Sequence, residues 1–495
     1  MRHRGWLVLA GLNLVAFAAI ALLSRPRAPH RLPNVVIFSI CSLRADRLAS
    51  LGGTSSLTPA IDALARRGVV FEHAYTQGSS SRPSHQTLFT GRYPRIPPGA
   101  THRQVPEGET TLAEVLRAHG YANAGFTGGG DVAAVWGFSR GFDVYSDDGG
   151  SQKLLDCVTH GLTWLDGTWR REQPFMLFME ASDVHPGPPQ IALCPDAASL
   201  DADAQLVHRV LGTPPQGALD IYQGNYYQRP VTGKRSFTEQ INELERHPER
   251  HAPQRLTEGM KRHFIAHYDA GVRKADDAFG TLMAGLASRG LQDETLVIVI
   301  GDHGWDLFEK GFFRNTVHCY DGIGRVPLVM AGPTLPRGRR VTGVAGLIDV
   351  APTVLDYLGI APEKDHEGHS LLAAMREAGG GTSTPAPDAL PRYVVSYSDT
   401  RVHLRMGGWE LVMFTDEKRV ELYDQKGDPE ELRDLSRVPA RAEALKSMLA
   451  FFDQEQVNHA LPNPVNDVMH LTDSPQVQRS VPEDVRTFMR QYGYW

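Results

Sequence analysis

The stretch Asn34-Val-Val-Ile-Phe-Ser-Ile40 decides the fold class of this chain, because it is one continuous β-branched and apolar run. Such a run predicts a strand that is buried on both faces, as in parallel sheets covered by helices. Predicted helices alternate with predicted strands along the chain. We therefore expect an α/β fold with a mostly parallel central sheet flanked by helices. The further strands are predicted at 69–71, 121–126, 174–179, 295–300 and 326–330, and the helices at 58–68, 111–120 and 263–288.

Local signals mark the ends of these helices. Thr58-Pro59 places a capping residue before a proline at the first helical position, and Gly68 is predicted to end that helix. Thr111 and Glu114 form a capping-box pattern at the start of the next helix. Gly290 is predicted to end the helix at 263–288, whose apolar residues repeat at intervals of three and four.

The composition excludes several classes of protein. The 495 residues carry a formal charge of −6, with 41% hydrophobic and 22% charged residues. Disorder, a collagen-like repeat and a multi-span transporter do not fit these values. A slightly acidic chain has no overall electrostatic basis for binding nucleic acid, so we expect no nucleic-acid partner. The four cysteines, Cys41, Cys157, Cys194 and Cys319, are too few for a disulfide scaffold, and two bridges, one or none remain open.

An apolar segment lies at the start of the chain, at residues 5–23, broken only by Asn13. As a helix it would be roughly 28 Å long, close to the thickness of a bilayer core. We expect an uncleaved membrane anchor, and the core of a signal peptide is the alternative. The anchor places the protein on the membrane at its periplasmic or extracellular face, whereas cleavage would make it a secreted protein.

The amino-acid composition and the periodicity of the sequence change at three further places. The segment 186–258 is rich in proline and has little periodicity, which is typical of a lid or binding loop; a disordered surface excursion is the alternative. The segment 379–391 has the Gly, Pro, Thr and Ser content of a linker. Beyond it, short strand patterns and one helix predict a small α+β subdomain. The expected parts are an anchor and linker at 1–32, an α/β catalytic domain at 33–378, the linker at 379–391, and the subdomain and tail at 392–495.

Polar clusters follow three of the predicted strands. Cys41-Ser42 follows the first strand, Asp183-Val-His185 another, and Asp302-His303 a third. Ligands of open α/β sheets bind beyond the carboxyl ends of the strands. Adjacent Asp and His at such a place can both turn into one cleft and ligate a metal. A turn-forming role of the Asp-His-Gly sequence is the alternative.

A fourth polar cluster surrounds Ser81. In Ser81-Arg-Pro-Ser-His85, Pro83 suits the first turn of a helix, so Ser81 would lie at the helix N-terminus. The free N–H groups and the positive end of the helix dipole favour an alkoxide and an anionic ligand there. A serine that only caps the helix is the alternative.

Taken in order, these motifs resemble those of the sulfatase family of the alkaline-phosphatase-like superfamily. The resemblance is collinear and covers about residues 33 to 495. It rests on Ile40–Arg47, Thr58–Asp62, Ser81–His85 with Leu88–Pro94, Asp183–His185, Tyr268-Asp269, Asp302–Gly304, Arg325–Leu328, Leu347–Leu355, Glu421–Asp424 and the tail from Val481 to Tyr494.

The resemblance implies an enzyme that cleaves a sulfate ester, or in related branches a phosphate or phosphonate ester, with one divalent metal ion. It places Ser81 on the nucleophile, and Asp302 and His303 on two metal-ligand positions. His185 falls on a histidine that contacts the substrate anion. His318 lies in a region that often supplies a cationic substrate contact; a packed or surface histidine is the alternative.

These assignments are chemically coherent. The metal would lower the pKa of the Ser81 hydroxyl, and attack by Ser81 would give a covalent ester. His185 and His85, when protonated, would offset charge on the transferred group. The expected catalytic residues are therefore Ser81, His85 and His185.

Two positions depart from the family pattern. Cys41 stands where the family has an aspartate ligand of Ca²⁺ or Mg²⁺. A thiolate ligand favours Zn²⁺ or Mn²⁺, so Cys41, Ser81, Asp302 and His303 form the expected metal set. Cys41 as a small buried residue in a metal-poor, inactive site is the alternative. His85 stands where members that convert their nucleophile to formylglycine have arginine, which favours an unmodified Ser81 hydroxyl.

The first hypothesis is thus a membrane-anchored sulfuric ester hydrolase. Its expected partner is a small-molecule or glycan sulfate or phosphate ester. A phosphoester hydrolase or phosphoglycerol-type transferase that uses unmodified Ser81 is the second hypothesis. A non-catalytic binding protein that kept the fold and lost the metal is the third.

Overall fold

A computed structural model provides the structure of the chain. It describes residues 32–54, 56–94, 104–147, 152–185, 245–246, 257–315, 318–376, 393–398, 401–414 and 419–459. The predicted linker 379–391, the tail from 481 and nearly all of the insertion 186–258 lie outside these residues. Among the described residues, Cys41, Cys157 and Cys319 are buried and form no disulfide, which excludes two disulfide bridges.

The α/β prediction is confirmed by an eight-stranded central sheet. The strands lie in the order β10-β2-β9-β6-β1-β5-β3-β4. β1 is fully buried and pairs in parallel with β5 and β6, as its apolar run predicted. The strand bounds are β1 Asn34–Ile40, β2 Val69–Tyr75, β3 Ala122–Thr127, β4 Val144–Ser146, β5 Phe175–Ala181, β6 Thr295–Gly301, β9 Leu328–Ala331 and β10 Arg339–Gly346.

The sheet is mixed rather than uniformly parallel, because β9 pairs antiparallel with both β2 and β6. A parallel return would need a crossover to the other end of the sheet. The segment between β6 and β9 includes the short antiparallel pair β7 (Asp306–Leu307) and β8 (Phe313–Arg314) and the helix α11 (Asp321–Gly324). It carries Asp302 and His303 beyond the carboxyl end of β6, so the chain re-enters the sheet from that end.

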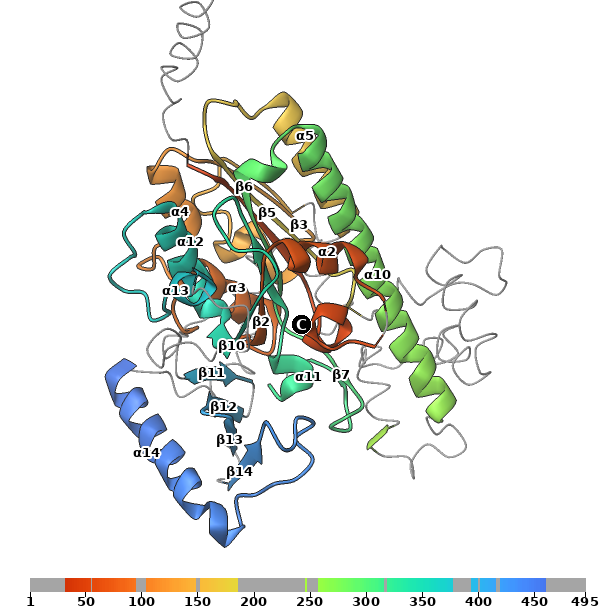
Figure 1. Cartoon of the computed structure of the whole chain (residues 1–495), viewed down its shortest axis with the longest axis vertical. Helices are drawn as coiled ribbons and strands as arrows, with labels where there is room; N and C mark the ends of the chain where they lie inside the picture. The colour runs from red at the N-terminus through yellow and green to blue at the C-terminus, as the bar shows by residue number, and fades with distance from the viewer. Residues whose placement is uncertain are drawn as a thin grey trace, which may run out of the picture. The chain divides into compact units, whose positions relative to one another are not determined.

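Helices cover both faces of the sheet. Figure 1 shows α2, α5 and α10 on one side of the sheet and α4, α12 and α13 on the other. Apolar side chains of the first group, including Phe279, pack on Val36 and Phe38 of β1. The helix bounds are α2 Pro59–Arg67, α3 Ser81–Thr90, α4 Leu112–Ala118, α5 Leu154–Gly167, α10 Glu258–Ser288, α12 Val350–Leu358 and α13 Leu372–Arg376.

The helix ends agree only partly with the sequence signals. The Thr111–Glu114 capping box is present, and Gly290 has φ +67 after α10, which begins five residues earlier than the predicted His263. The predicted cap by Thr58 is wrong, because its hydroxyl donates to Asp62 Oδ2 at 3.0 Å. The carboxylate of Asp276 accepts instead from the first free N–H groups of α2, those of residues 60 and 61, at 2.9 and 2.8 Å.

Gly68 follows the last residue of α2, as predicted, with a φ of −140, so its backbone is not left-handed. A side chain is excluded there for another reason. A Cβ at this position would lie 2.2 Å from the carbonyl oxygen of Met330 on β9. Glycine therefore permits the close approach of the end of α2 to the sheet.

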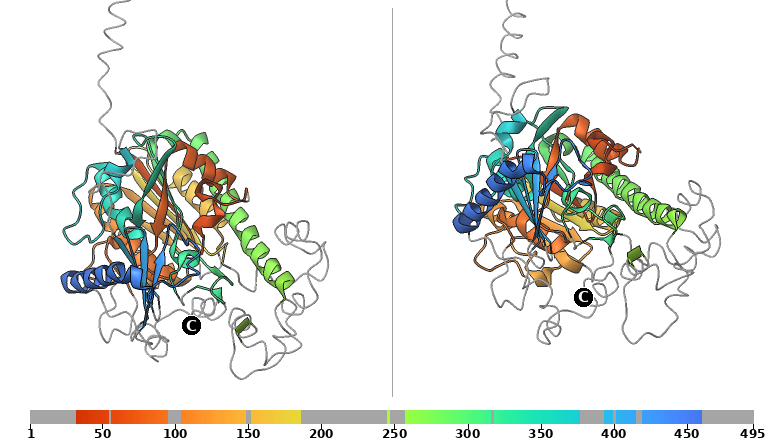
Figure 2. Two further views of the ribbon diagram at one scale, coloured as in Figure 1. Left: turned by 60° about the horizontal axis from the view of Figure 1, so that its bottom comes forward. Right: turned by 90° about the horizontal axis from the view of Figure 1, so that it is seen from below.

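A second sheet follows in the chain. It is antiparallel, in the order β11-β12-β13-β14, and α14 lies beside it in both views of Figure 2. Ser79 N donates to Tyr397 O at 3.1 Å, and Tyr397 N donates to Gln77 O at 3.0 Å, so β11 is tied to the loop before α3. The bounds are β11 Tyr393–Tyr397, β12 Arg401–Met406, β13 Trp409–Phe414, β14 Arg419–Asp424 and α14 Ala442–His459.

Within the described residues, no helix combines the length and the apolar character that a membrane span requires. The predicted anchor at 5–23 lies outside them and stays a prediction.

Candidate functional site

The strand register brings three polar clusters to one edge of the sheet. Ile40 of β1 pairs with Ala181 of β5 and with Gly301 of β6, so Cys41 and Asp302 both come directly after neighbouring strand ends. One ligand atom from each of Cys41, Asp302 and His303 lies within 4.8 Å of the others, and all three residues are buried. This is the edge at which open α/β sheets bind their ligands.

Ser81 is the first residue of α3 and lies beside this group. Its Oγ is 3.4 Å from Cys41 Sγ and 3.3 Å from His303 Nε2. Pro83 occupies the first turn of α3, as its sequence position predicted. Ser81 is 4% exposed, so a substrate would meet its hydroxyl in a pocket largely shielded from water. The structure therefore brings together all four residues of the expected metal set.

His303 is oriented by its own loop. Its Nδ1 donates to the carbonyl oxygen of Gly304 at 2.8 Å, which leaves the Nε2 lone pair of the neutral ring free to accept. Ser81 Oγ and Asn315 Nδ2 both lie 3.3 Å from that nitrogen. The lone pair thus points into the space that Ser81 and Cys41 share.

A divalent cation fits the donors of this pocket. Asp302 Oδ1 accepts from the backbone N–H groups of Ser42 and His303 at 2.9 and 2.7 Å. Its Oδ2 is buried and has no hydrogen-bond partner among the described residues. A carboxylate oxygen in that state, next to an imidazole lone pair, is the arrangement that a bound cation satisfies.

The charges of the residues around this pocket also favour a bound cation. Burial and then the carboxylates of Asp302 and Glu180 raise the pKa of the Cys41 thiol well above its usual value. A thiol becomes a good ligand only when it loses its proton, and a nearby metal ion supplies the charge that drives this loss. Cys41, Ser81, Asp302 and His303 would together hold the ion.

His85 lies behind Ser81 on α3 and is fully buried. Its Nδ1 donates to the carbonyl oxygen of Ser81 at 2.8 Å, and its Nε2 lies 2.9 Å from the hydroxyl of Ser39 on β1. Burial lowers the pKa of His85, although the charge of Asp302 opposes the shift. These contacts favour a neutral ring that holds the start of α3 against the sheet.

The other two predicted histidines have different surroundings. His185 follows β5 and packs edge-on against Trp305, with ring centroids 4.5 Å apart. His318 Nε2 lies 2.7 Å from Asp306 Oδ2. Burial, followed by the charges of Arg401 and Lys310, lowers the pKa of His318 well below its usual value. The side chain of this segment that touches His303 is Asn315, not His318.

Sequence reasoning missed two residues of this pocket. Asn315 follows β8, and no local pattern distinguishes it from its neighbours. Glu180 is the only charged residue in the strand Phe175–Ala181, and it is buried. A charged side chain inside an otherwise apolar buried strand was a usable signal, because such residues are rarely buried without a reason.

The backbone at Ser42 is strained, with φ +65. Its N–H donates to Asp302 and its carbonyl accepts from Tyr268 at 2.7 Å, so the surroundings fix this conformation. We expect Ser42→Gly to be neutral or to stabilise the fold by about 1 kcal/mol, and Ser42→Val to destabilise it by roughly 1–2 kcal/mol. Thermal unfolding of the two variants measures the difference; equal melting temperatures would show that the strain is not real.

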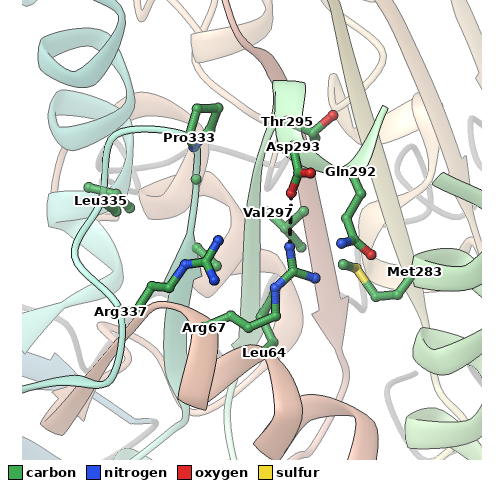
Figure 3. A pocket seen from close by; sticks show the side chains of 12 residues that line it. Leu64, Arg67, Met283, Gln292, Asp293, Thr295, Val297, Pro333, Leu335 and Arg337 are labelled. Atoms are coloured by element: carbon green, nitrogen blue, oxygen red, sulfur yellow. Dashed lines mark hydrogen bonds and ion pairs between the residues drawn. The ribbon is translucent and has the colours of Figure 1, made fainter. Parts of the chain in front are cut away.

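A cleft of about 140 Å³ lies at the opposite edge of the sheet, near Thr295 at the beginning of β6. Figure 3 shows the guanidinium groups of Arg67 and Arg337 at its rim, and Arg67 is paired with Asp293 at 3.2 Å. Its lining contains neither a cysteine, a serine nor a histidine. The candidate chemistry therefore lies at the other end of the strands.

An α/β sheet with a hydroxyl and a cation-ligand group at this edge places the protein in the class of alkaline-phosphatase-like hydrolases. The comparisons with known proteins agree with this class and identify a family within it. The family model "Sulfatase" matches residues 33–360, and a second model, "N-sulphoglucosamine sulphohydrolase, C-terminal", matches residues 301–458. The chain therefore belongs to the sulfatase family, a family of sulfuric ester hydrolases.

Curated relatives match over nearly their whole length. Arylsulfatase K of Gallus gallus is 23% identical over 484 residues, which is 90% of this chain and 86% of the relative. The Delta 4,5-hexuronate-2-O-sulfatase of Bacteroides thetaiotaomicron is 23% identical over 469 residues, 88% of this chain and 91% of the relative.

Solved structures share the fold at lower identity. A protein solved in complex with its substrate D-glucosamine-2-N,6-O-disulfate gives a TM-score of 0.67 at 17% identity, over 88% of this chain and 100% of that one. The phosphonate monoester hydrolase of Agrobacterium radiobacter gives 0.65 at 18% identity, over 86% and 96%. The predicted family and the predicted α/β architecture are confirmed.

Proposed function

We propose that this protein hydrolyses a sulfate ester with the unmodified hydroxyl of Ser81 as nucleophile. The observation that carries the proposal is the position of Ser81 Oγ, at a helix N-terminus and within 3.4 Å of both Cys41 Sγ and His303 Nε2. A hydroxyl at this position is next to the donors of a cation and to the positive end of α3.

The proposed reaction has two steps. Ser81 Oγ bonds to the sulfur atom as the bond from sulfur to the ester oxygen breaks, and the proton lost by Ser81 ends on the departing alcohol. Water then cleaves the seryl sulfate and restores the hydroxyl. A bound divalent cation would supply a Lewis acid that stabilises the alkoxide of Ser81. We assign His185 to the sulfate anion, while the neutral ring of His85 keeps the Ser81 backbone in place.

The proposed substrates are sulfated sugars. Relatives are named for a hexuronate 2-O-sulfate and an N-acetylglucosamine 6-O-sulfate, which supports this substrate class for the present chain. The test is a paired assay of purified protein with an aryl sulfate, a sulfated monosaccharide and an aryl phosphate. Release of sulfate supports the proposal. A preference for phosphate would support the second hypothesis, and inertness toward all three the non-catalytic one.

The proposed metal is Zn²⁺ or Mn²⁺ rather than Ca²⁺ or Mg²⁺. A thiol ligand at position 41 matches borderline cations, whereas Ca²⁺ and Mg²⁺ prefer oxygen. Metal analysis of purified protein should show about one divalent ion per chain; a metal-free protein would contradict the proposed site.

The variant Cys41→Asp tests this metal preference. A carboxylate at the same strand end is a hard ligand, so we expect activity in Mg²⁺ or Ca²⁺ to rise by at least about tenfold relative to the unchanged protein. Hydrolysis of an aryl sulfate across a series of metals measures this rise. Cys157→Asp is not a suitable control because of its burial in the core; Cys41→Ser, which removes the thiol without adding a charge, is the matched variant and should not show the gain.

A phosphoester hydrolase or phosphoglycerol-type transferase is the second candidate function. His85 supports it, because it stands where members that convert their nucleophile to formylglycine have arginine, and an unmodified hydroxyl on this fold also suits a phosphoester. The structural likeness to a phosphonate monoester hydrolase supports the same fold for such chemistry. The sulfate and phosphate arms of the paired assay separate the two candidates.

We also propose that residues 5–23 anchor the protein at the periplasmic or extracellular face of a membrane, and that the linker 379–391 joins a catalytic domain at 33–378 to a small α+β subdomain and tail at 392–495. The apolar length of 5–23 supports the anchor. Fractionation of cells that express the full chain tests it, since a cleaved signal peptide would leave the protein soluble and shorter. Limited proteolysis within 379–391 tests the division.

A further inference from the structure

Arg44 is a buried arginine that connects the two loops from which the candidate cation ligands come. It lies in the loop after β1 and is 6% exposed. Its Nε and Nη2 donate to the two carboxylate oxygens of Asp46, at 3.0 and 2.8 Å, within the same loop. Its Nη1 donates to the carbonyl oxygen of Trp305 at 2.9 Å and lies 2.8 Å from Glu309 Oε1. Both of these partners belong to the loop after β6, so one guanidinium group binds the two loops together.

The backbone of Arg44 is fixed relative to Cys41. The Arg44 N–H donates to the hydroxyl oxygen of Tyr268 on α10 at 3.0 Å, and the same hydroxyl donates to the carbonyl oxygen of Ser42 at 2.7 Å. The N–H of Ser42 in turn donates to Asp302 Oδ1 at 2.9 Å. The turn from Cys41 to Arg44 is therefore held along its length, and the guanidinium group has a defined position with respect to the thiol.

The carbonyl group that Arg44 holds lies two residues after His303. The imidazole of His303 is oriented by the peptide between them, because its Nδ1 donates to the carbonyl oxygen of Gly304 at 2.8 Å. The indole ring of Trp305 packs edge-on against His185, with ring centroids 4.5 Å apart. A displacement of the Trp305 carbonyl would therefore move the group that orients His303.

The segment next to Arg44 is closely packed on both sides. Trp305 N donates to the carbonyl oxygen of Gly322 in α11 at 3.0 Å. A Cβ on Gly304 would lie 2.2 Å from the same oxygen and 3.0 Å from Arg44 Cγ. Since the segment fits between α11 and the stem of the arginine, its position depends on that side chain.

We propose that Arg44 is a positioning residue of the candidate site, which holds the loop after β6 against the loop after β1 and so sets the distance between His303 and Cys41. This inference deepens the proposed function and rests on it, because both residues are proposed ligands of its cation. A lysine would not do the same. The planar guanidinium binds the Asp46 carboxylate with two donors and still presents Nη1 to the second loop, whereas an ammonium group is a single charge on a flexible stem.

The test is metal binding by the folded protein rather than turnover. The full-length protein is freed of metal with a chelator and titrated with Zn²⁺ by calorimetry, well below the melting temperature of the metal-free protein. We expect Arg44→Lys to weaken Zn²⁺ binding by at least about tenfold, the usual effect of losing a group that orients metal ligands. Lower stability alone would not change this affinity, because the protein is folded under these conditions.

Arg47→Lys is the matched control. Arg47 lies in the same loop, 3.0 Å from the same Asp46 and 2.7 Å from Asp269 on α10. In the part of the chain that the structure describes, it has no hydrogen bond or ion pair with the loop after β6. Arg47→Lys should therefore bind Zn²⁺ as the unchanged protein does.

Loading with Co²⁺ in place of Zn²⁺ adds a spectroscopic readout, because the visible absorption of Co²⁺ depends on its coordination geometry. Arg44→Lys should change the shape of the spectrum, and Arg47→Lys should reproduce that of the unchanged protein. If Arg44→Lys does not fold, Tyr268→Phe carries the same test, since it removes only the hydroxyl that holds Ser42 and the Arg44 backbone. Its Zn²⁺ affinity should fall by at least about threefold.

The outcomes distinguish the two proposals. Zn²⁺ binding by the unchanged protein, together with equal affinity and an equal Co²⁺ spectrum in Arg44→Lys, would overturn the role of Arg44 alone. An equal loss of affinity in Arg47→Lys would also overturn it, because the effect would then come from the charges of the loop and not from the connection between the two loops. An unchanged protein that binds neither ion would instead contradict the proposed function itself.

Discussion

Replacing Ser81 with alanine is expected to lower kcat for sulfate ester hydrolysis by roughly 10³-fold or more, because it removes the atom that forms the covalent ester. The hydroxyl lies at the first position of α3, 3.3 Å from His303 Nε2. Alanine suits a helix, so the fold should be retained. The measurement is single-turnover hydrolysis of an aryl sulfate, together with the melting temperature.

The matched control is Thr87→Val on the same helix. The Thr87 hydroxyl is fully buried without a hydrogen-bond partner among the described residues, so its loss should leave activity unchanged and stability equal or higher. Intact mass of the unchanged protein shows whether Ser81 keeps both hydrogens that conversion to formylglycine removes. Retained activity in Ser81→Ala would exclude Ser81 as the nucleophile.

The residues of the site differ in how far the sequence could predict them. Ser81 was placed correctly because Pro83 fixes the start of a helix through local backbone geometry. Cys41 and Asp302 met at one edge because buried parallel strands bring their carboxyl ends together. Asn315 could not be found in this way, since its place depends on the turn between β7 and β8 and on a contact across the fold.

Local sequence patterns also predicted the fold only in part. The apolar run of β1 predicted a buried strand, but an apolar run of similar length does not reveal its direction, and β9 runs antiparallel to its neighbours. β10 was missed because Arg339–Gly346, at the sheet edge, contains two arginines, a threonine and two glycines and lacks a continuous apolar run. Likewise, Asp276 caps α2 from a helix more than 200 positions later in sequence, whereas Thr58, the local candidate, does not.

Arg405→Leu is expected to destabilise the protein by about 3–5 kcal/mol, because it leaves buried carboxylates without a counter-charge. Arg405 is fully buried in β12, and its Nη2 lies 2.8 Å from Glu410 Oε1 and 3.8 Å from oxygens of both Asp321 and Glu431. These three acids lie close enough together to repel one another. The guanidinium also lies over the ring of Tyr75, 4.2 Å from its centroid, and so joins β12 to the end of β2 in the central sheet.

The pH dependence of this loss follows from the charges. Burial opposes ionisation of Glu410, but Arg405 and hydrogen bonds from Glu431 and His403 outweigh it and lower its pKa to about 2. A carboxyl with a depressed folded-state pKa stabilises the fold above its unfolded pKa, and this contribution disappears as the pH falls through the folded value. In Arg405→Leu the carboxyl can instead take up a proton as the pH falls, so the destabilisation should be largest near pH 7 and smaller near pH 4.

Urea unfolding of the full chain at both pH values measures the effect. The double variant Arg405→Leu/Glu410→Gln removes one of the stranded charges together with the arginine, and it should recover part of the lost stability, since coupled groups are not additive. Arg340→Leu, which removes a half-exposed arginine bound to Glu72 at 2.6 Å, is the control and should cost less than about 1 kcal/mol. Removing one member of a buried ion pair ordinarily costs several times 1 kcal/mol. A loss of stability below about 1 kcal/mol for Arg405→Leu at pH 7 would therefore mean that the buried arginine does not hold the two sheets together.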